Sequence, residues 1–595
     1  MHTPHLTPKI LHEAIITGCQ SVVLGKEQLN EINIFPVADS DTGDNLASTA
    51  HAIIANARLT LHFNEMLQSV AEASLYGARG NSGIIFSQFF NGLTQVDHDK
   101  TAMDTQAFSK ALLCAARSVR ASLSSPVDGT MLTMIEDFAS ASSNFSQHTT
   151  CFNELMDTLL PVLKVCLNNT REKIPSLKKA NVVDAGALGF YFFVEGFASL
   201  LAGRALVQNN YSKDLEHQGE HNHAMLETKP IHRYCTEAIL KSDVIDTVRL
   251  TKVLQKHGDS LGVTGNEKMC RLHIHTNTPA NFFATLMEQG NVMHPKVDDM
   301  LRQFEVLQMR KYDIALVTDS SADIPQIIRD EYQVHQIPLN IHIDDHHLLD
   351  RYCFEPNVFY KNLNTLKKHP KTSLASPFLL EEKLTFLSKH YKHVLVISIA
   401  KSMSGTFDAM TQVAKKLSNV CVIDSRTNSG AHGLLVQYAG ELIREGRSFQ
   451  SVIQCIEDAI METSIFVMVN SLGAMVRSGR INKLAGKIGQ LSGIKPIISI
   501  DKTGKGFHFS TALNRDHALS KMITLTQKMQ SCPGKILERY CIVHAGVDEK
   551  AHDFSKRTTE AFQKAPAYIE NVSPVIGLHA GYGCIALAMR ITTGK

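Results

Sequence analysis

Short apolar runs that end in small polar residues recur along the chain after residue 312. Residues 313–321, 394–399 and 420–425 have this pattern, and helical stretches lie between them. Such runs are typical of strands buried on both faces, and their alternation with helices predicts a parallel α/β sheet. Ligands bind such sheets beyond the carboxyl ends of the strands, so the polar tips predict a ligand site. A second lobe is expected after about residue 462, with strands at 497–500 and 540–544.

The pattern before residue 205 is different. Apolar residues recur there at helical spacing, with few strand-like runs between them. Between the two patterns, residues 271–276 alternate as a strand does, which places His273 and His275 on one face. The predicted organisation is a helical domain at 1–207, a polar linker at 208–228, a small α+β middle domain at 229–308, and a two-lobed α/β region at 311–595 with lobes at about 311–461 and 462–595.

Composition narrows the classes of function. The chain has 595 residues, of which 44% are hydrophobic, and a net charge of +2. That size predicts several domains, and that charge predicts neither a nucleic-acid groove nor an anionic membrane surface as partner. No apolar run reaches the roughly 18 residues of a membrane span, and the N-terminus lacks the pattern of a signal peptide. The twelve cysteines have no disulfide-like spacing, so a reducing cytoplasm is expected.

An acidic loop at residues 33–45 has the highest density of polar and acidic side chains in the helical part. It holds Asp39, Asp41 and Asp44, with hydroxyl and carboxamide groups between them. Oxygen ligands without Cys or His favour Mg²⁺, which in proteins usually also binds phosphate oxygens. A solvated turn explains the same composition equally well, because Asp, Asn and Gly favour turns for local reasons.

Three further loops favour the nucleotide interpretation. Residues 77–83, 124–130 and 183–186 are polar, Gly-containing segments that fall at expected helix starts. Free N–H groups and a positive dipole end make such positions suitable for phosphate.

Taken together, these loops resemble the L-subunit family of dihydroxyacetone kinases, and more closely the kinase subunit of bacterial fatty acid kinase. The similar segments are Phe35–Val37, Asp39–Gly43, Gly77–Gly83 and Val182–Gly186. The resemblance implies an all-α helical-barrel domain that binds ATP, with Asp39 and Asp41 holding Mg²⁺ at the reacting phosphates. The residues implied at the nucleotide are Thr42, Asn45, Ser82, Gly129, Thr130 and Asp184. Asp44 is an additional carboxylate that would either tighten or crowd the metal site.

The middle segment resembles the central domain of the same kinase family. The resemblance implies that Cys235, His273 and His275 bind Zn²⁺, and Cys270 is a candidate fourth ligand because it is near in sequence. A catalytic role for His273 and His275 in phosphoryl transfer is an alternative. A hydrogen-bonded His pair beside a buried Cys, without a metal, is another.

Residues 312–595 resemble the DegV family of fatty-acid-binding proteins. The similar segments include residues 317–323, 372–377, 404–406, 478–481 and 577–581. The resemblance implies that Thr372, Ser373 and Ser404 bind a fatty acid carboxylate, with His579 as a further donor. Arg480 is expected to support a loop or a docking surface, and Lys401 stands where the family commonly has serine.

The chain therefore resembles a fusion of a kinase module with a lipid carrier. The function that this implies is an ATP- and Mg²⁺-dependent fatty acid kinase that makes an acyl phosphate, with Zn²⁺ in the middle domain. Expected partners are a long-chain fatty acid and enzymes of phospholipid synthesis that use acyl phosphate, and a homodimer is expected. The alternatives are a kinase for a small dihydroxyacetone-like substrate, and a lipid-binding or sensory protein with a silent kinase domain.

Overall fold

The structure is a computed structural model that describes residues 3–35, 41–96, 102–123, 126–206, 229–363, 368–477, 480 and 494–593. The predicted linker at 208–228 and Asp39 lie outside these ranges. The chain divides into two compact units, Met1–Phe304 and Glu305–Lys595, which are described separately. None of the helices in the described ranges combines the length and the apolarity that a bilayer crossing requires.

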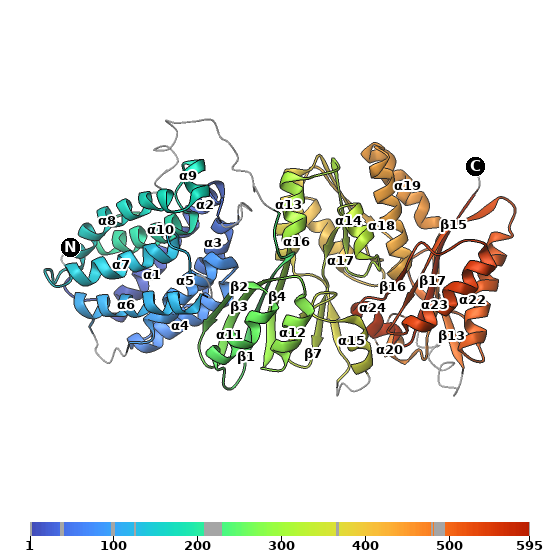
Figure 1. Ribbon diagram of the computed structural model, residues 1–595, viewed down its shortest axis with the longest axis horizontal. Coiled ribbons are helices and arrows are strands. Elements are labelled where there is room, and N and C mark those ends of the chain that lie inside the picture. Colours follow the sequence, from blue (N-terminus) through green and yellow to red (C-terminus); the bar gives the residue numbers. More distant parts are fainter. Residues whose placement is uncertain are drawn as a thin grey trace. The chain divides into compact units, whose positions relative to one another are not determined.

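The N-terminal part of the first unit is helical, as the periodicity predicts (Figure 1). Thr7, Asp104 and Asp184 each cap a helix with a side-chain oxygen. The core contains a cluster of phenylalanine rings in edge-to-face contact, including Phe86, Phe90 and Phe193. The helices are α1 Pro8–Leu24, α2 Lys26–Glu31, α3 Thr42–Asn56, α4 Phe63–Gly77, α5 Gly80–Leu93, α6 Thr105–Ser122, α7 Met131–Phe145, α8 Phe152–Lys173, α9 Pro175–Ala180 and α10 Ala185–Leu201.

The middle domain is an antiparallel sheet in the strand order β2-β3-β1-β4. Its elements are β1 Tyr234–Lys241, α11 Thr247–Leu254, η1 Gln255–His257, β2 Asp259–Gly265, β3 Met269–Thr276, α12 Pro279–Met287, β4 Asn291–Asp299 and α13 Met300–Gln308. The sheet packs on α4 and α5, where Leu75 contacts Ile239 and Met269. The Asn91 side chain donates to the Gly265 carbonyl at 2.8 Å. One face of this sheet therefore lies against the helical domain.

The first lobe of the second unit contains the predicted parallel sheet, in the order β11-β10-β5-β6. Helices α16 and α17 pack on one face through Leu384 and Met410, and α18 packs on the other. A small antiparallel sheet has the order β8-β7-β9. The elements are β5 Ile314–Asp319, α14 Gln326–Glu331, β6 His335–Ile337, β7 Asn340–Ile343, β8 His346–Leu349, α15 Pro356–Asn362, β9 Lys371–Ser373, α16 Pro377–His390, β10 His393–Ser398, α17 Thr406–Ala414, β11 Val420–Asp424, α18 Ser429–Arg444 and α19 Phe449–Glu462.

The second lobe is a larger sheet in the order β14-β13-β12-β17-β15-β16. Its pairs are antiparallel except β15 with β16, a mixture that the sequence pattern did not predict. Helix α18 lies between the two large sheets, since a Cβ at Gly430 would be 2.9 Å from Cys541 and one at Gly433 would be 2.3 Å from the Asp323 carbonyl. The elements are β12 Thr463–Met468, α20 Gly473–Arg477, β13 Lys495–Ile500, β14 Gly506–Ala512, α22 Arg515–Gln530, β15 Lys535–His544, α23 Asp548–Phe562, β16 Ile569–Asn571, α24 Pro574–Ala580 and β17 Ile585–Thr593.

Candidate functional site

The first turns of several helices meet at one end of the helical domain. A Cβ at Gly80, the first residue of α5, would lie 2.4 Å from the Asn45 carboxamide of α3. A Cβ at Gly186 in α10 would lie 3.3 Å from Met131, the first residue of α7. Close approach of these backbones gathers N–H groups and positive dipole ends, which is the arrangement that binds phosphate.

The predicted nucleotide residues lie in these first turns. Asp41 precedes α3, and its side chain makes no capping hydrogen bond to that helix. Thr42 and Asn45 follow it and are largely buried. Gly129 has a φ of +91°, a conformation that favours glycine, and its N–H donates to Thr133 at 2.8 Å. The Thr130 hydroxyl donates to the Val127 carbonyl at 2.8 Å, so it stabilises the turn in which it lies. Ser82 lies in the first turn of α5 and is partly buried.

Asp44 contacts two residues of α2. Its carboxylate lies 2.6 Å from the Lys26 ammonium and accepts a hydrogen bond from the Asn30 side chain at 2.9 Å. The Asp44 N–H donates to Asn30 Oδ1 at 3.2 Å. The additional carboxylate therefore attaches α3 to α2.

Asp184 has a buried carboxylate at the start of α10. It accepts the Ala187 N–H at 2.7 Å as the helix cap. Burial raises the pKa of Asp184 to about 7, although hydrogen bonds from the N–H groups of Ala187, Met131 and Gly186 act in the opposite direction. These bonds join the first turns of α10 and α7. Asp184 thus helps to build the end of the domain where the predicted nucleotide loops meet.

The middle domain brings Cys235, His273 and His275 together on one face. Cys235 of β1 is the register partner of His275 in β3. One ligand atom from each of the three residues lies within 4.8 Å of the others. Cys270 was a wrong expectation as fourth ligand. It lies on the opposite face of β3 and is fully buried, because alternation along a strand separates residue 270 from residues 273 and 275.

The three side chains fit a zinc ion. His273 Nε2 is buried and makes no hydrogen bond among the described residues, although its other nitrogen has partners. Burial, with smaller contributions from His273 and His232, lowers the pKa of His275 to about 3, so its imidazole is in the neutral form that binds metals. Burial and then the charge of Glu237 raise the pKa of the Cys235 thiol, an effect that a bound cation would reverse. A set of one Cys and two His leaves one position of tetrahedral zinc open.

Glu237 is a buried residue of this face that the sequence analysis did not identify. It lies on β1 two residues after Cys235, opposite His273 in the register. Its carboxylate contacts Arg271 at 2.5 Å, His273 Nδ1 at 3.3 Å and the Gly80 N–H at 2.7 Å. The last contact joins the middle domain to the first turn of α5.

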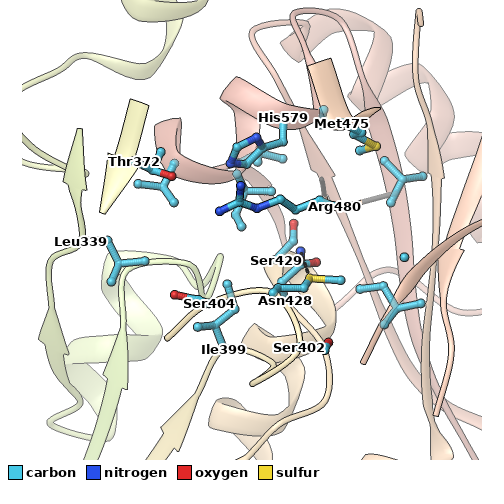
Figure 2. Close-up of a pocket in the computed structure, with 18 of the residues that line it drawn as sticks. Leu339, Thr372, Ile399, Ser402, Ser404, Asn428, Ser429, Met475, Arg480 and His579 are labelled. Carbon is cyan, nitrogen blue, oxygen red and sulfur yellow. Dashed lines mark hydrogen bonds between the residues drawn. The ribbon is translucent and has the colours of Figure 1, made fainter. Parts of the chain in front are cut away.

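The second unit contains a pocket of about 610 Å³ between its two large sheets (Figure 2). Pockets that bind small molecules have volumes of about 300–1,000 Å³. The lining is mostly apolar and includes Leu339, Leu374, Ile399, Met403, Val467, Ile498, Ile500, Val572, Val575, Ile576 and Ala586. Polar side chains in the lining include Thr372, Ser373, Ser404, Asn428, Arg480 and His579.

The structure places all four predicted fatty acid residues in the lining of this pocket. Figure 2 shows Thr372, Ser404, Arg480 and His579 around one cavity, although they come from distant parts of the chain. The Ser404 hydroxyl is 2.8 Å from the Thr406 hydroxyl at the start of α17. Ser373 is exposed, and its hydroxyl lies 3.0 Å from His342.

His579 has an unsatisfied polar atom at this pocket. Its Nδ1 is buried and makes no hydrogen bond among the described residues. Burial, assisted by Arg480 and His369, lowers the pKa of His579 to about 4, so the ring is neutral near pH 7. A neutral imidazole can donate one hydrogen bond to a ligand oxygen. Lys401 also lines the pocket, where its ammonium lies 3.0 Å from Asp408.

A buried group of charged residues attaches the helix of His579 to the first lobe. Asp323 accepts the Ser573 N–H at 2.8 Å and the Ser429 hydroxyl at 2.5 Å, and it pairs with Arg351. Asp350 accepts the Val575 N–H at 3.2 Å. Because Ser573 caps α24, these bonds fix the position of the helix that carries His579.

Comparison with known families gives three matches that follow one another along the chain. A DAK2 domain model matches residues 36–199. A model of the middle domain of FakA-like fatty acid kinase proteins matches residues 231–307, and the DegV family model matches residues 313–591. The chain is a fusion of a DAK2 region, a FakA-like middle domain and a DegV region. The resemblance found in the sequence motifs is therefore confirmed.

Curated relatives match about half of the chain. An uncharacterized protein of Staphylococcus saprophyticus is 29% identical over 315 residues, which are 51% of this chain and 57% of that protein. Protein YloV of Bacillus subtilis is 29% identical over 303 residues, 49% of this chain and 55% of that protein. The chain thus spans a little over half the length of the curated relatives it matches.

Solved structures of DegV proteins match about half of the chain. The crystal structure of DegV, a fatty acid binding protein from Bacillus subtilis, is 27% identical and covers 47% of this chain and 100% of that chain, with a TM-score of 0.43. A fatty acid binding DegV family protein from Streptococcus agalactiae is 27% identical and covers 47% and 98%, with a TM-score of 0.43.

Proposed function

We propose that the fusion is an ATP- and Mg²⁺-dependent fatty acid kinase with a built-in carrier. The observation that carries this proposal is the apolar pocket of about 610 Å³ that His579 helps to line. The Nδ1 atom of His579 is buried and has no hydrogen-bond partner among the described residues. The same chain has a DAK2 domain and a FakA-like middle domain. A long acyl chain fills an apolar pocket, and its carboxylate needs donors of the kind that line this one.

The carboxylate is bound between Thr372, Ser404 and His579. Thr372 and Ser404 supply hydroxyl donors, and the neutral His579 ring supplies an N–H donor. Ser404 stands just before α17, whose first-turn N–H groups and dipole also favour an anion. Hydrogen bonds to a charged group are worth about 1.5–3 kcal/mol each, so removing one should weaken binding measurably.

The phosphoryl group comes from ATP bound at the end of the helical domain. Asp39 and Asp41 hold Mg²⁺, which neutralises phosphate charge when it is bound. Thr42, Asn45, Ser82, Gly129 and Thr130 line the nucleotide, and Asp184 holds the first turns of α7 and α10 in place. A carboxylate oxygen attacks the γ-phosphorus, the bond to the β-phosphate oxygen breaks, and ADP leaves. Positioning and charge neutralisation are sufficient for this chemistry, without a covalent enzyme intermediate.

Zn²⁺ is held by Cys235, His273 and His275 and fixes the face of the middle domain that lies next to the nucleotide loops. The connection between the kinase-like and DegV regions raises their effective concentration for each other. An acyl phosphate is a reactive acyl donor, so its consumers are acyltransfer enzymes of phospholipid synthesis in the cytoplasm.

Trapping of the product with hydroxylamine tests the proposal. Purified protein with ATP, Mg²⁺ and a long-chain fatty acid should give the acyl hydroxamate, detected by mass spectrometry. Asp41→Asn should abolish the hydroxamate and leave fatty acid binding unchanged. Fatty acid binding without any hydroxamate from the wild-type protein would contradict the kinase proposal and would favour a lipid-binding or sensory protein instead. Phosphorylation of dihydroxyacetone without bound lipid would favour a small-molecule kinase.

A further inference from the structure

Glu237 contacts two parts of the first unit that have different predicted roles. One carboxylate oxygen lies 2.7 Å from the Gly80 nitrogen and 3.3 Å from His273 Nδ1. The other oxygen accepts from the Arg271 guanidinium at 2.5 Å. The Glu237 side chain is 1% exposed and that of Arg271 is 4% exposed, so water does not replace these bonds.

The hydrogen bond from the Gly80 N–H to Glu237 fixes the start of α5. Gly80 is the first residue of α5, and its N–H has no acceptor within the helix, as is general for first-turn N–H groups. The position needs glycine, because φ is +55° and a Cβ would collide with Asn45. Glu237 therefore fixes the backbone at the start of α5, where the predicted nucleotide residue Ser82 lies in the first turn.

The hydrogen bond between Glu237 and His273 Nδ1 orients a predicted metal-binding side chain. His273 Nδ1 lies 3.3 Å from the Glu237 carboxylate and 3.7 Å from the Cys235 Sγ. When Nδ1 carries the proton and donates it to Glu237, Nε2 keeps its lone pair for a metal. Nε2 is the buried atom of His273 that makes no hydrogen bond among the described residues. Outer carboxylates that orient ligating histidines in this way typically change metal affinity by about 10–100-fold when they are removed.

We propose that Glu237 is a positioning residue that couples the nucleotide loop of α5 to the Cys235, His273 and His275 group. Zinc at that group fixes the His273 tautomer, which fixes the Glu237 carboxylate and with it the Gly80 N–H. Zinc therefore raises nucleotide affinity, and by reciprocity nucleotide raises zinc affinity by the same factor. This inference rests on the proposed function, since it requires a nucleotide at the helical domain.

The experiment measures coupling directly and does not depend on activity. The dissociation constant of MgADP is measured by calorimetry on the full chain after chelation and after reloading with zinc. Zinc affinity is measured by competition with a chromogenic chelator, with and without MgADP. Typical coupling energies predict a change of at least about fivefold in the wild type. Glu237→Gln should bring the factor close to one and weaken zinc binding by about 10-fold or more.

Two further variants keep the result interpretable. Glu267→Gln removes an exposed carboxylate from the turn between β2 and β3, and it should preserve the wild-type coupling. Glu237→Asp is the substitute test if Glu237→Gln does not fold. The shorter side chain keeps a negative charge near Arg271 but no longer reaches the Gly80 N–H, so this variant should also lose coupling. Nucleotide binding that zinc does not change, or wild-type coupling in folded Glu237→Gln, would overturn this inference and leave the kinase proposal standing. No nucleotide binding in either metal state would overturn both.

Discussion

Replacing Asp323 by alanine should release α24 from the first lobe and disturb the ligand pocket. The carboxylate is fully buried and accepts from the Ser573 N–H at 2.8 Å and the Ser429 hydroxyl at 2.5 Å. Its removal also takes away one of the charges that neutralise the buried Arg351. Breaking a buried ion pair from one side costs about 3–5 kcal/mol. We expect α24 to open more easily by about that amount.

Hydrogen exchange measured by mass spectrometry on peptides that cover α24 is the appropriate assay, because it reports local opening free energies. A cost of about 3–5 kcal/mol predicts exchange at least about a hundredfold faster in Asp323→Ala. The matched control is Glu381→Ala, which breaks the exposed pair with Lys416 at 2.8 Å and should cost less than about 1 kcal/mol. Exchange in α24 within about tenfold of the wild type would refute the argument that this buried group holds the helix.

Three other predictions concern single side chains. Ser404→Ala should weaken fatty acid binding about 10–100-fold by calorimetry, because one bond to a carboxylate is lost, whereas Ser402→Ala should not, since that hydroxyl donates to Gly504 at 2.6 Å. Asp44→Asn should leave the Mg²⁺ dependence of the kinase reaction unchanged, and a large change would place Asp44 at the metal instead of at Lys26. The pKa of Asp184 is raised to about 7 by burial, so the folded state keeps a proton that the unfolded state releases above about pH 4. Stability should therefore fall as pH rises from about 4 to 7, by up to about 4 kcal/mol relative to Asp184→Asn, and equal pH profiles would contradict this.

The sequence predicted what local periodicity and motifs determine. Strands β5, β10 and β11 pair in parallel as expected, although β11 lies at the edge of the sheet and is only partly buried. The four polar loops fall at the starts of α3, α5, α7 and α10. Alternation along β3 correctly placed His273 and His275 on one face. The same alternation places Cys270 on the opposite face, so Cys270 is not the fourth zinc ligand that its nearness in sequence had suggested.

Long-range partners could not be predicted from the sequence. Glu237 became visible only through the register of β1 with β3 and through its contact with Gly80, 157 positions away. The bond from Ser573 to Asp323 spans 250 positions. The antiparallel order of the second lobe depends on pairing between distant strands, which local patterns do not specify.

In the proposed reaction, the γ-phosphoryl group of ATP is transferred to the carboxylate of a bound fatty acid. Phosphorus NMR of the reaction with a fatty acid labelled with oxygen-18 in its carboxylate tests this most directly. We predict an acyl phosphate resonance displaced by the heavy bridging oxygen, formed in the same amount as ADP. ADP with unlabelled inorganic phosphate, and no labelled acyl phosphate, would contradict it.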